Sequence, residues 1–173
     1  IITGIRRCGK STLLLQLLRR DYQDAIYLNF DDIRLSGFEI SDFMRLHREI
    51  EKRKINVLFF DEIQIVKGWE QYINQLLREN YKVFITGSNA SMLSIELGTH
   101  LTGRHLSMEL FPFSYWEFIK FKTLENGENA ILDYLNLGGI PEYIKTGISV
   151  VLNALVDDIL MRDIAVRHAI RDI

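Results

Sequence analysis

The sequence predicts an α/β fold in which helices cover a parallel sheet, followed by a segment that is helical throughout. First, the pattern Gly-x-x-x-x-Gly-Lys-Ser occupies residues 4–11, between an apolar pair and a run with helical character. Second, short apolar runs alternate with amphipathic stretches, which is typical of strands joined through helices. Third, from Tyr115 onward the apolar residues recur with helical spacing.

The first predicted elements follow directly from residue composition and spacing. A helix follows the glycine pattern over residues 12–21, and residues 25–30 are rich enough in β-branched and aromatic side chains to form a strand. The polar, periodic stretch 41–52 predicts a helix with Ser41 as its cap. Residues 57–60 are wholly apolar, as expected of a strand that is covered on both faces.

The alternation continues to about residue 111. A helix is predicted at 69–80, a strand at 81–86, a short helix at 91–97 and a fifth strand at 105–111. Further helices are predicted at 115–122, 130–137, 141–145 and from residue 150 to the end of the chain. We therefore expect residues 1–113 to form the α/β core and residues 114–173 to form a helical lid with the start of a linker.

Residues 4–11 have the spacing of a phosphate-binding loop. The two glycines allow backbone N–H groups to wrap a phosphate, and the helix that starts near Lys10 adds a positive dipole end. In this pattern the lysine reaches the outer phosphates, and the hydroxyl of Ser11 ligates magnesium. The predicted nucleotide-binding residues are Gly4, Ile5, Arg6, Arg7, Cys8, Gly9, Lys10, Ser11 and Thr12. A plain glycine turn before a helix is the alternative interpretation.

Composition excludes several other classes of protein. The net charge of −2 gives no general attraction to nucleic acid, and no apolar run approaches the roughly 20 residues that span a bilayer. The single cysteine, Cys8, cannot form an internal disulfide, which agrees with a reducing cytoplasm. Its place beside Lys10 favours a reactive thiolate if the sulfur is accessible, and a small core residue if it is not.

Acidic and polar residues follow the predicted strands. Asp61 ends the apolar run and supplies the second carboxylate that a magnesium site beside a phosphate loop needs, and Glu62 stands where a base polarises water. Asn89 follows the next strand, where its amide orients the attacking water or touches the γ-phosphate, unless it is an ordinary turn residue. Asp31 and Asp32 follow an earlier strand and are interpreted as a turn, with an outer magnesium contact as the alternative.

Taken together, the motifs resemble those of the prokaryotic AAA-type ATPases. The resemblance is strongest to the poorly characterised family whose ATPase domain precedes a separate C-terminal domain. The motifs are Gly-x-Arg-Arg-x-Gly-Lys-Ser (4–11), Tyr-Leu-Asn (27–29), Phe-Asp-Glu-Ile-Gln (60–64), Trp-Glu (69–70), Ile-Thr-Gly-Ser-Asn (85–89), Leu-Thr-Gly-Arg (101–104) and Pro-Phe-Ser-Tyr-x-Glu-Phe (112–118). The resemblance implies a P-loop NTPase three-layer sandwich with a five-stranded parallel sheet in the order 5-1-4-3-2 and a helical lid.

The resemblance also implies roles for individual residues. Asp61 is the magnesium-site acid, Glu62 the catalytic base and Asn89 the first sensor. Arg104 is a possible arginine finger that completes the site of a neighbouring subunit, although an exposed charge or an internal ion pair remain alternatives. Pro141, in Gly-Gly-Ile-Pro, is similar to the proline that related signalling ATPases place against adenine.

These features predict a cytoplasmic enzyme that binds ATP and Mg²⁺ and hydrolyses the β–γ phosphoanhydride. The chain starts without methionine and stops within a helical rhythm, so we expect a fragment whose absent C-terminal domain is moved by hydrolysis and contacts a protein or DNA partner. One alternative is a regulatory switch that holds ATP or ADP and hydrolyses it slowly. Another is a small-molecule kinase, which the acidic pair directly after the strand disfavours.

Overall fold

A computed structural model describes residues 1–87 and 105–161 of the chain. The predicted helix at 91–97, residues 162–173 of the last predicted helix, Asn89 and Arg104 lie outside the described residues. The chain divides into two compact units, described separately below. The α/β unit comprises Ile1–Gly4 with Lys10–Glu109, and the helical unit comprises Ile5–Gly9 with Leu110–Ile173.

The centre of the α/β unit is a parallel three-stranded sheet. Its strands β2 (Ile26–Asn29), β3 (Val57–Asp61) and β4 (Lys82–Ile85) lie in the order β2-β3-β4, as the apolar runs predict. The register places Asn29 of β2 opposite Asp61 of β3. The residues that follow parallel strands therefore gather at one edge of this sheet.

The described parts of the chain contain two parallel sheets, of two and three strands, in place of the single five-stranded sheet that was predicted. Strand β1 (Ile2–Thr3) pairs with β5 (Met108–Glu109) in a separate two-stranded parallel sheet, and a parallel bridge joins Ile2 to Thr86 directly after β4. The ladder between β3 and β4 ends at Ile85, and the bridge from Ile2 to the next residue keeps the pairing order 5-1-4-3-2 that the resemblance implies.

The fifth strand is also shorter than its alternating pattern predicts. Only two residues of the stretch 105–111 form a ladder. Of the alternating apolar side chains, Leu106 and Met108 are exposed, by 90% and 51%, and Leu110 is partly exposed. Alternation stabilises a strand where one face is buried, and here that burial is missing.

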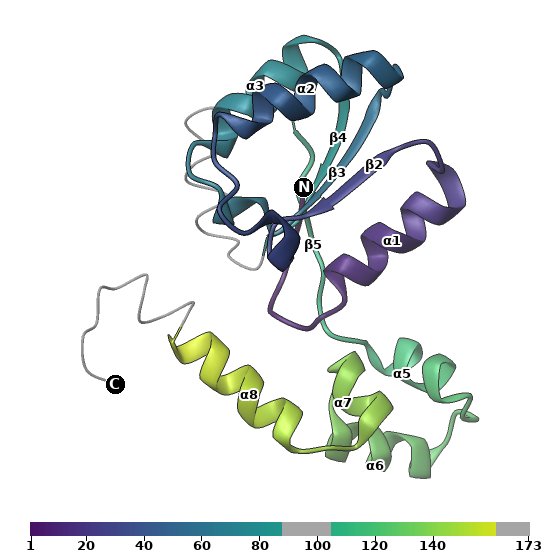
Figure 1. Cartoon of the computed structure of the whole chain (residues 1–173). Helices are drawn as coiled ribbons and strands as arrows, with labels where there is room; N and C mark the ends of the chain where they lie inside the picture. Colours follow the sequence, from purple (N-terminus) through teal and green to yellow (C-terminus); the bar gives the residue numbers. More distant parts are fainter. Residues whose placement is uncertain (88–104, 162–173) are drawn as a thin grey trace. The chain divides into compact units, whose positions relative to one another are not determined.

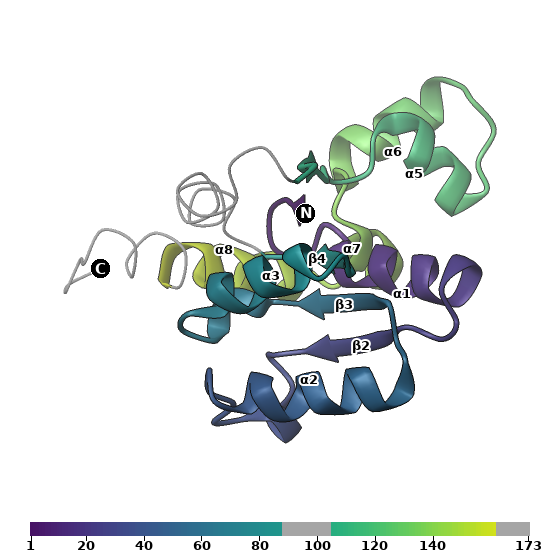
Figure 2. The same cartoon turned by 90° about the horizontal axis from the view of Figure 1, so that it is seen from above.

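Helices cover both faces of the three-stranded sheet (Figures 1 and 2). On one face, α1 (Lys10–Asp21) contacts β3, and Tyr22 just beyond its end packs against Phe59 and Phe84 with ring centroids 5.8 and 5.3 Å away. The other face carries α2 (Asp42–Arg53) and α3 (Trp69–Arg78). Because successive strand residues point to opposite faces, Asp61 shares the α1 face with Phe59.

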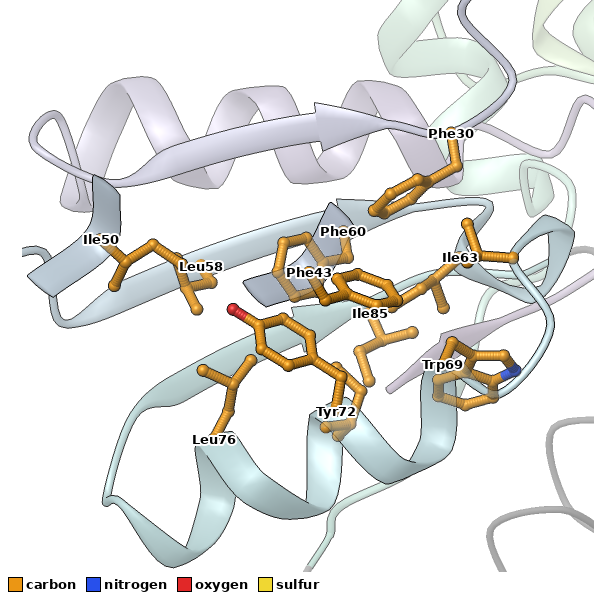
Figure 3. Close-up of a cluster of buried hydrophobic side chains, with 12 residues drawn as sticks. Phe30, Phe43, Ile50, Leu58, Phe60, Ile63, Trp69, Tyr72, Leu76 and Ile85 are labelled. Carbon is orange, nitrogen blue, oxygen red and sulfur yellow. The ribbon is translucent and has the colours of Figure 1, made fainter. Parts of the chain in front are cut away.

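The main hydrophobic core lies between the sheet and the pair α2 and α3 (Figure 3). Leu58 and Phe60 of β3 supply its sheet side, and Phe43 of α2 stacks on Tyr72 of α3 at a centroid distance of 4.3 Å. Its buried members are Phe30, Phe43, Ile50, Leu58, Phe60, Ile63, Val66, Trp69, Tyr72, Ile73, Leu76 and Ile85. This burial fixes the strands whose ends carry the acidic residues.

One predicted cap differs from the structure. Ser41 stands at the N-cap position of α2, but its backbone is helical and its side chain makes no capping hydrogen bond. Instead, the Asp42 carboxylate accepts a hydrogen bond of 3.0 Å from the Glu39 backbone N–H. This hydrogen bond joins the first helical residue to the turn before it, so it does not replace the predicted cap, whose acceptor would bind an N–H group inside the first turn.

The described part of the helical unit contains four helices, as its spacing predicts. They are α5 (Tyr115–Lys122), α6 (Glu128–Leu137), α7 (Pro141–Thr146) and α8 (Val150–Asp158). Helix α5 begins with a capping box between Ser114 and Glu117, and its Phe118 is fully buried against Ile144 and Ala130. No helix in the described parts of the chain is long and apolar enough to cross a bilayer.

Candidate functional site

The first component of the site is the lysine at the start of α1. Lys10 is 5% exposed, and its Nζ donates a hydrogen bond of 2.9 Å to the Gly4 carbonyl. Gly9 has a φ of +106°, and a Cβ built there would meet no atom within 4 Å. A phosphate needs a positive charge and backbone N–H groups that it can approach closely. The Lys10 ammonium group supplies the charge, and the backbone at Gly9, in a conformation that favours glycine, is open to such an approach. Ser11 and Thr12 follow in the first turn of the helix.

The loop residues Ile5–Gly9, between Gly4 and Lys10, belong to the helical unit. Arg7 has a left-handed backbone (φ 62°) and pairs with two carboxylates, Glu142 of α7 through a Nη1–Oε2 distance of 3.2 Å and Asp158 of α8 through a Nη2–Oδ2 distance of 3.7 Å. Cys8 is 2% exposed, which favours the small core residue over the accessible thiolate. Pro141 is the first residue of α7, next to Glu142.

Asp61 ends β3 and is completely buried. The Tyr27 hydroxyl donates to its Oδ2 at 2.7 Å, and the Thr86 hydroxyl donates to its Oδ1. Burial, this hydrogen bond and the negative charges of Asp61 and Glu62 raise the pKa of Tyr27, which keeps the hydroxyl a donor. The Asp61 carboxylate is thus held in one orientation by Tyr27 within β2 and by Thr86 directly after β4.

Glu62 follows in a different environment. It is only partly buried, and its backbone is left-handed with φ 53°. Its N–H donates to Thr86 Oγ1 at 3.2 Å, and its Oε2 accepts a hydrogen bond from Nε2 of Gln64 in the 3-10 helix η2 (Ile63–Ile65). A single hydroxyl, that of Thr86, therefore contacts both members of the acidic pair.

The sheet geometry places the acidic pair and the start of α1 at the same edge. Tyr22, beyond the C-terminal end of α1, packs on Phe59 in the middle of β3, so α1 runs back along the sheet from the strand ends. Its N-terminus with Lys10 and Ser11 consequently lies toward the edge where Asp61 stands, on the same face.

The oxygens at this edge are suitable for a hard divalent cation. A carboxylate offers about four lone-pair positions, so Asp61 retains acceptor capacity beside its two hydrogen bonds. Within residues 1–87 and 105–161 no group of three His, Cys, Asp or Glu side chains could hold a metal alone. This donor set suits Mg²⁺, which is commonly bound by one or two protein oxygens together with water and nucleotide phosphates.

The other two acidic residues considered from the sequence, Asp31 and Asp32, stand in a hydrogen-bonded turn. Asp32 accepts hydrogen bonds from the backbone and guanidinium of Arg34 and caps the 3-10 helix η1 (Ile33–Leu35). These hydrogen bonds lower the pKa of Asp32 to about 2. Asn29 Oδ1 accepts from the Asp31 backbone N–H at 2.9 Å. Both acids therefore form a turn, as predicted for them.

Comparison with known proteins agrees with this geometry. Residues 1–119 match the family described as AAA domain. The chain belongs to this AAA domain family. It therefore carries an AAA-type, P-loop ATPase-like domain, for which nucleotide binding is the expected property.

Two relatives match nearly the whole AAA-type chain. An uncharacterised protein of Methanocaldococcus jannaschii is 37% identical, with 100% of the chain and 43% of the relative covered. An uncharacterised protein of Haemophilus influenzae is 33% identical, with 99% of the chain and 47% of the relative covered. The chain thus spans less than half the length of these relatives.

Three residues of the candidate site were not found by sequence reasoning. Tyr27 and Thr86 contact Asp61 from neighbouring strands, and Gln64 contacts Glu62 from the following turn. All three stand inside the motifs that carry the resemblance. A polar residue within or directly after an apolar strand is the signal that would have indicated them, because buried polar groups require partners.

Proposed function

We propose that this chain binds ATP with Mg²⁺ and hydrolyses the β–γ phosphoanhydride, with hydrolysis driving a conformational change in an attached C-terminal domain. The observation that carries the proposal is the fully buried Asp61, followed by the partly exposed Glu62, on the sheet face and edge where α1 begins with Lys10. A P-loop ATPase needs these three groups for charge, metal binding and water activation.

Some of these residues are proposed to bind the nucleotide and Mg²⁺, and others to act in the hydrolysis step. Lys10 supplies positive charge to the outer phosphates, and the loop residues 4–9 with Ser11 and Thr12 supply backbone and hydroxyl donors. Ser11 and Asp61 hold Mg²⁺, which neutralises charge on the β- and γ-phosphates when bound. Glu62 accepts a proton from the attacking water, and Asn89 contacts the γ-phosphate or this water.

Arg7 is proposed to couple phosphate binding at the loop to the conformation of the helical unit. Its guanidinium pairs with Glu142 of α7 and Asp158 of α8 within the helical unit. Phosphate bound to the loop competes with these carboxylates for the guanidinium, because both are anions that arginine binds. Pro141, beside Glu142, is proposed to contact the adenine.

The test separates binding from turnover with one substitution. Glu62→Gln should bind ATP normally and lose turnover, because the base acts on water in the transition state and not on the ground state. Binding is measured with a fluorescent ATP analogue and turnover by phosphate release in a single-turnover experiment without added acceptor. Normal hydrolysis by the variant would remove Glu62 as the base, and tight binding without hydrolysis by the wild type would support the regulatory switch.

Arg104 is proposed to act in trans on a neighbouring subunit. Arg104→Ala should bind ATP normally and hydrolyse it about a thousandfold or more slowly. Mixing this variant with Lys10→Ala should restore part of the activity, because each subunit supplies what the other lacks. Activity per subunit that is independent of protein concentration, without rescue on mixing, would exclude this role.

A further inference from the structure

Gln64 has no part in the reaction described above, yet it contacts the proposed base. Its Nε2 donates a hydrogen bond to Glu62 Oε2. A carboxylate only accepts hydrogen bonds, so the nitrogen of the Gln64 amide must face Glu62 and the oxygen must point elsewhere. The contact therefore fixes both ends of the glutamine amide.

The other end of this amide lacks a partner. Gln64 Oε1 is buried and accepts no hydrogen bond from any residue in the described part of the chain. Buried carbonyl oxygens are normally hydrogen-bonded, and an unpaired one at a candidate site requires an explanation, of which a catalytic role is one. The unpaired acceptor belongs to the same side chain that holds the proposed base.

We propose that Gln64 orients the attacking water. Its Nε2 donates a hydrogen bond to Glu62, and its Oε1 accepts a hydrogen bond from the O–H of the water that Glu62 does not deprotonate. This inference rests on the proposed ATP hydrolysis and names a further residue for it. A water that donates one O–H to Glu62 and the other to Gln64 Oε1 directs its two lone pairs away from both residues. One of these lone pairs is then available to form the bond to the γ-phosphorus.

The reaction balances with these two residues and substrate. The water oxygen forms a bond to the γ-phosphorus while the bond from phosphorus to the β–γ bridging oxygen breaks, and its electron pair leaves with ADP. Glu62 takes the proton lost by the water, and the products are ADP and inorganic phosphate. Gln64 remains neutral throughout because it only accepts and donates hydrogen bonds.

The backbone around Gln64 supports a fixed position for this side chain. Ile63, directly before it, is fully buried in the main core, and Val66 after it is 2% exposed. The Val66 N–H donates to the Ile63 carbonyl at 3.0 Å, which closes the turn. A side chain on a turn anchored at both ends can hold water with little reorganisation during the reaction.

The experiment compares Gln64→Met with Gln75→Met in the purified protein. Gln75 is a matched control, because its Nε2 donates to the Glu79 carboxylate at 3.0 Å on an exposed part of α3. Gln64→Met should retain the affinity for a non-hydrolysable ATP analogue with Mg²⁺. It should weaken binding of the transition-state analogue ADP–aluminium fluoride by about 10- to 1,000-fold and slow single-turnover hydrolysis by a similar factor. Gln75→Met should change none of these quantities.

Several outcomes would overturn the inference. If Gln64→Met keeps wild-type affinity for ADP–aluminium fluoride and a wild-type rate, Gln64 does not orient the water. Equal losses of affinity for both analogues, with a lower Tm, would assign it a structural role instead. If Gln64→Met does not fold, Gln64→Glu replaces it: this near-isosteric variant keeps an oxygen but sets a like charge against Glu62, and wild-type turnover would reject the proposal. A wild type that binds ATP without hydrolysing it would overturn the proposed hydrolysis itself, and the role of Gln64 with it.

Discussion

The two ends of the three-stranded sheet each bury an ionisable side chain next to a tyrosine hydroxyl, but they do so differently. At the carboxyl end, the Tyr27 hydroxyl donates to Asp61 at 2.7 Å. Toward the opposite end, where Tyr81 leads into β4, Tyr72 Oη lies 3.5 Å from His47 Nδ1, and His47 Nε2 lies 3.2 Å from Glu79 Oε2. The first contact is short and direct, whereas the second is long.

The difference follows from the elements that carry the groups. Tyr27, Asp61 and Thr86 stand on or directly after three neighbouring strands, and the ladders fix their spacing. His47 and Tyr72 stand on helices α2 and α3, whose packing rests on apolar contacts that tolerate adjustment. We infer that the carboxyl end is organised to bind a ligand, and that the opposite end stabilises helix packing.

Removing the charge at the carboxyl end should have the largest effect on ligand binding. Lys10→Ala should abolish detectable ATP binding, because the ammonium group neutralises the outer phosphates. Titration with a fluorescent ATP analogue measures this loss. His47→Gln, at the opposite end, is the control and should bind the analogue with wild-type affinity; a similar loss in both variants would contradict the distinction between the two ends.

Removing the Thr86 hydroxyl, which contacts both Asp61 and Glu62, should reduce the free energy of unfolding and weaken Mg²⁺ binding. Thr86→Val removes the donor to Asp61 Oδ1 and the acceptor of the Glu62 N–H. Asp61 is fully buried, so in this variant its Oδ1 loses a hydrogen bond that water cannot easily replace. We therefore expect a loss of about 1–3 kcal/mol in the free energy of unfolding. Urea denaturation measures this loss, and titration with Mg²⁺ should show that more metal is needed for ATP binding.

Thr86→Ser is the matched control for the valine variant. It retains the hydroxyl and loses only a methyl group, so it should keep most of the Mg²⁺ dependence of the wild type. If serine and valine behave alike, the methyl group and not the hydrogen bonds would explain the effect.

A pair of tyrosine substitutions compares the two ends directly. Tyr27→Phe removes a hydrogen bond to a buried carboxylate and should cost about 1.5–3 kcal/mol, whereas Tyr72→Phe removes only a long contact and should cost less than about 1 kcal/mol. Urea denaturation at pH 7 measures both values. Equal costs would indicate that hydrogen-bond length at these two positions does not determine stability.

The smallest expected effect is a loss of stability at alkaline pH that depends on Tyr72, at the end of the sheet opposite Asp61. Burial, together with the negative charges of Tyr81 and Glu79, raises the pKa of Tyr72 above its ordinary value of 10.0. The unfolded chain then ionises first, so the contribution of Tyr72 to stability is complete below pH 10 and decreases as the pH rises above it. Tyr72→Phe should therefore lose less stability than the wild type between pH 9 and 11, and an identical loss would contradict the raised pKa.

The sequence alone determined the local features of this protein. The glycine spacing of residues 4–11, the apolar runs that became β2, β3 and β4, and the acidic pair after β3 are all encoded within short segments. Patterns of this kind depend on backbone propensity and on which side chains can be buried, so neighbouring residues suffice to predict them. The helices of the C-terminal region were predicted for the same reason.

Only the tertiary structure decided which side chains hold the acidic pair and where the sheet is interrupted. Tyr27 and Thr86 are separated from Asp61 by 34 and 25 positions, and they meet it because of the strand register. The alternating stretch around β5 predicts a full strand, but its side chains Leu106 and Met108 remain exposed and only two residues pair. Both outcomes depend on contacts between distant segments, and a local pattern carries no information about those contacts.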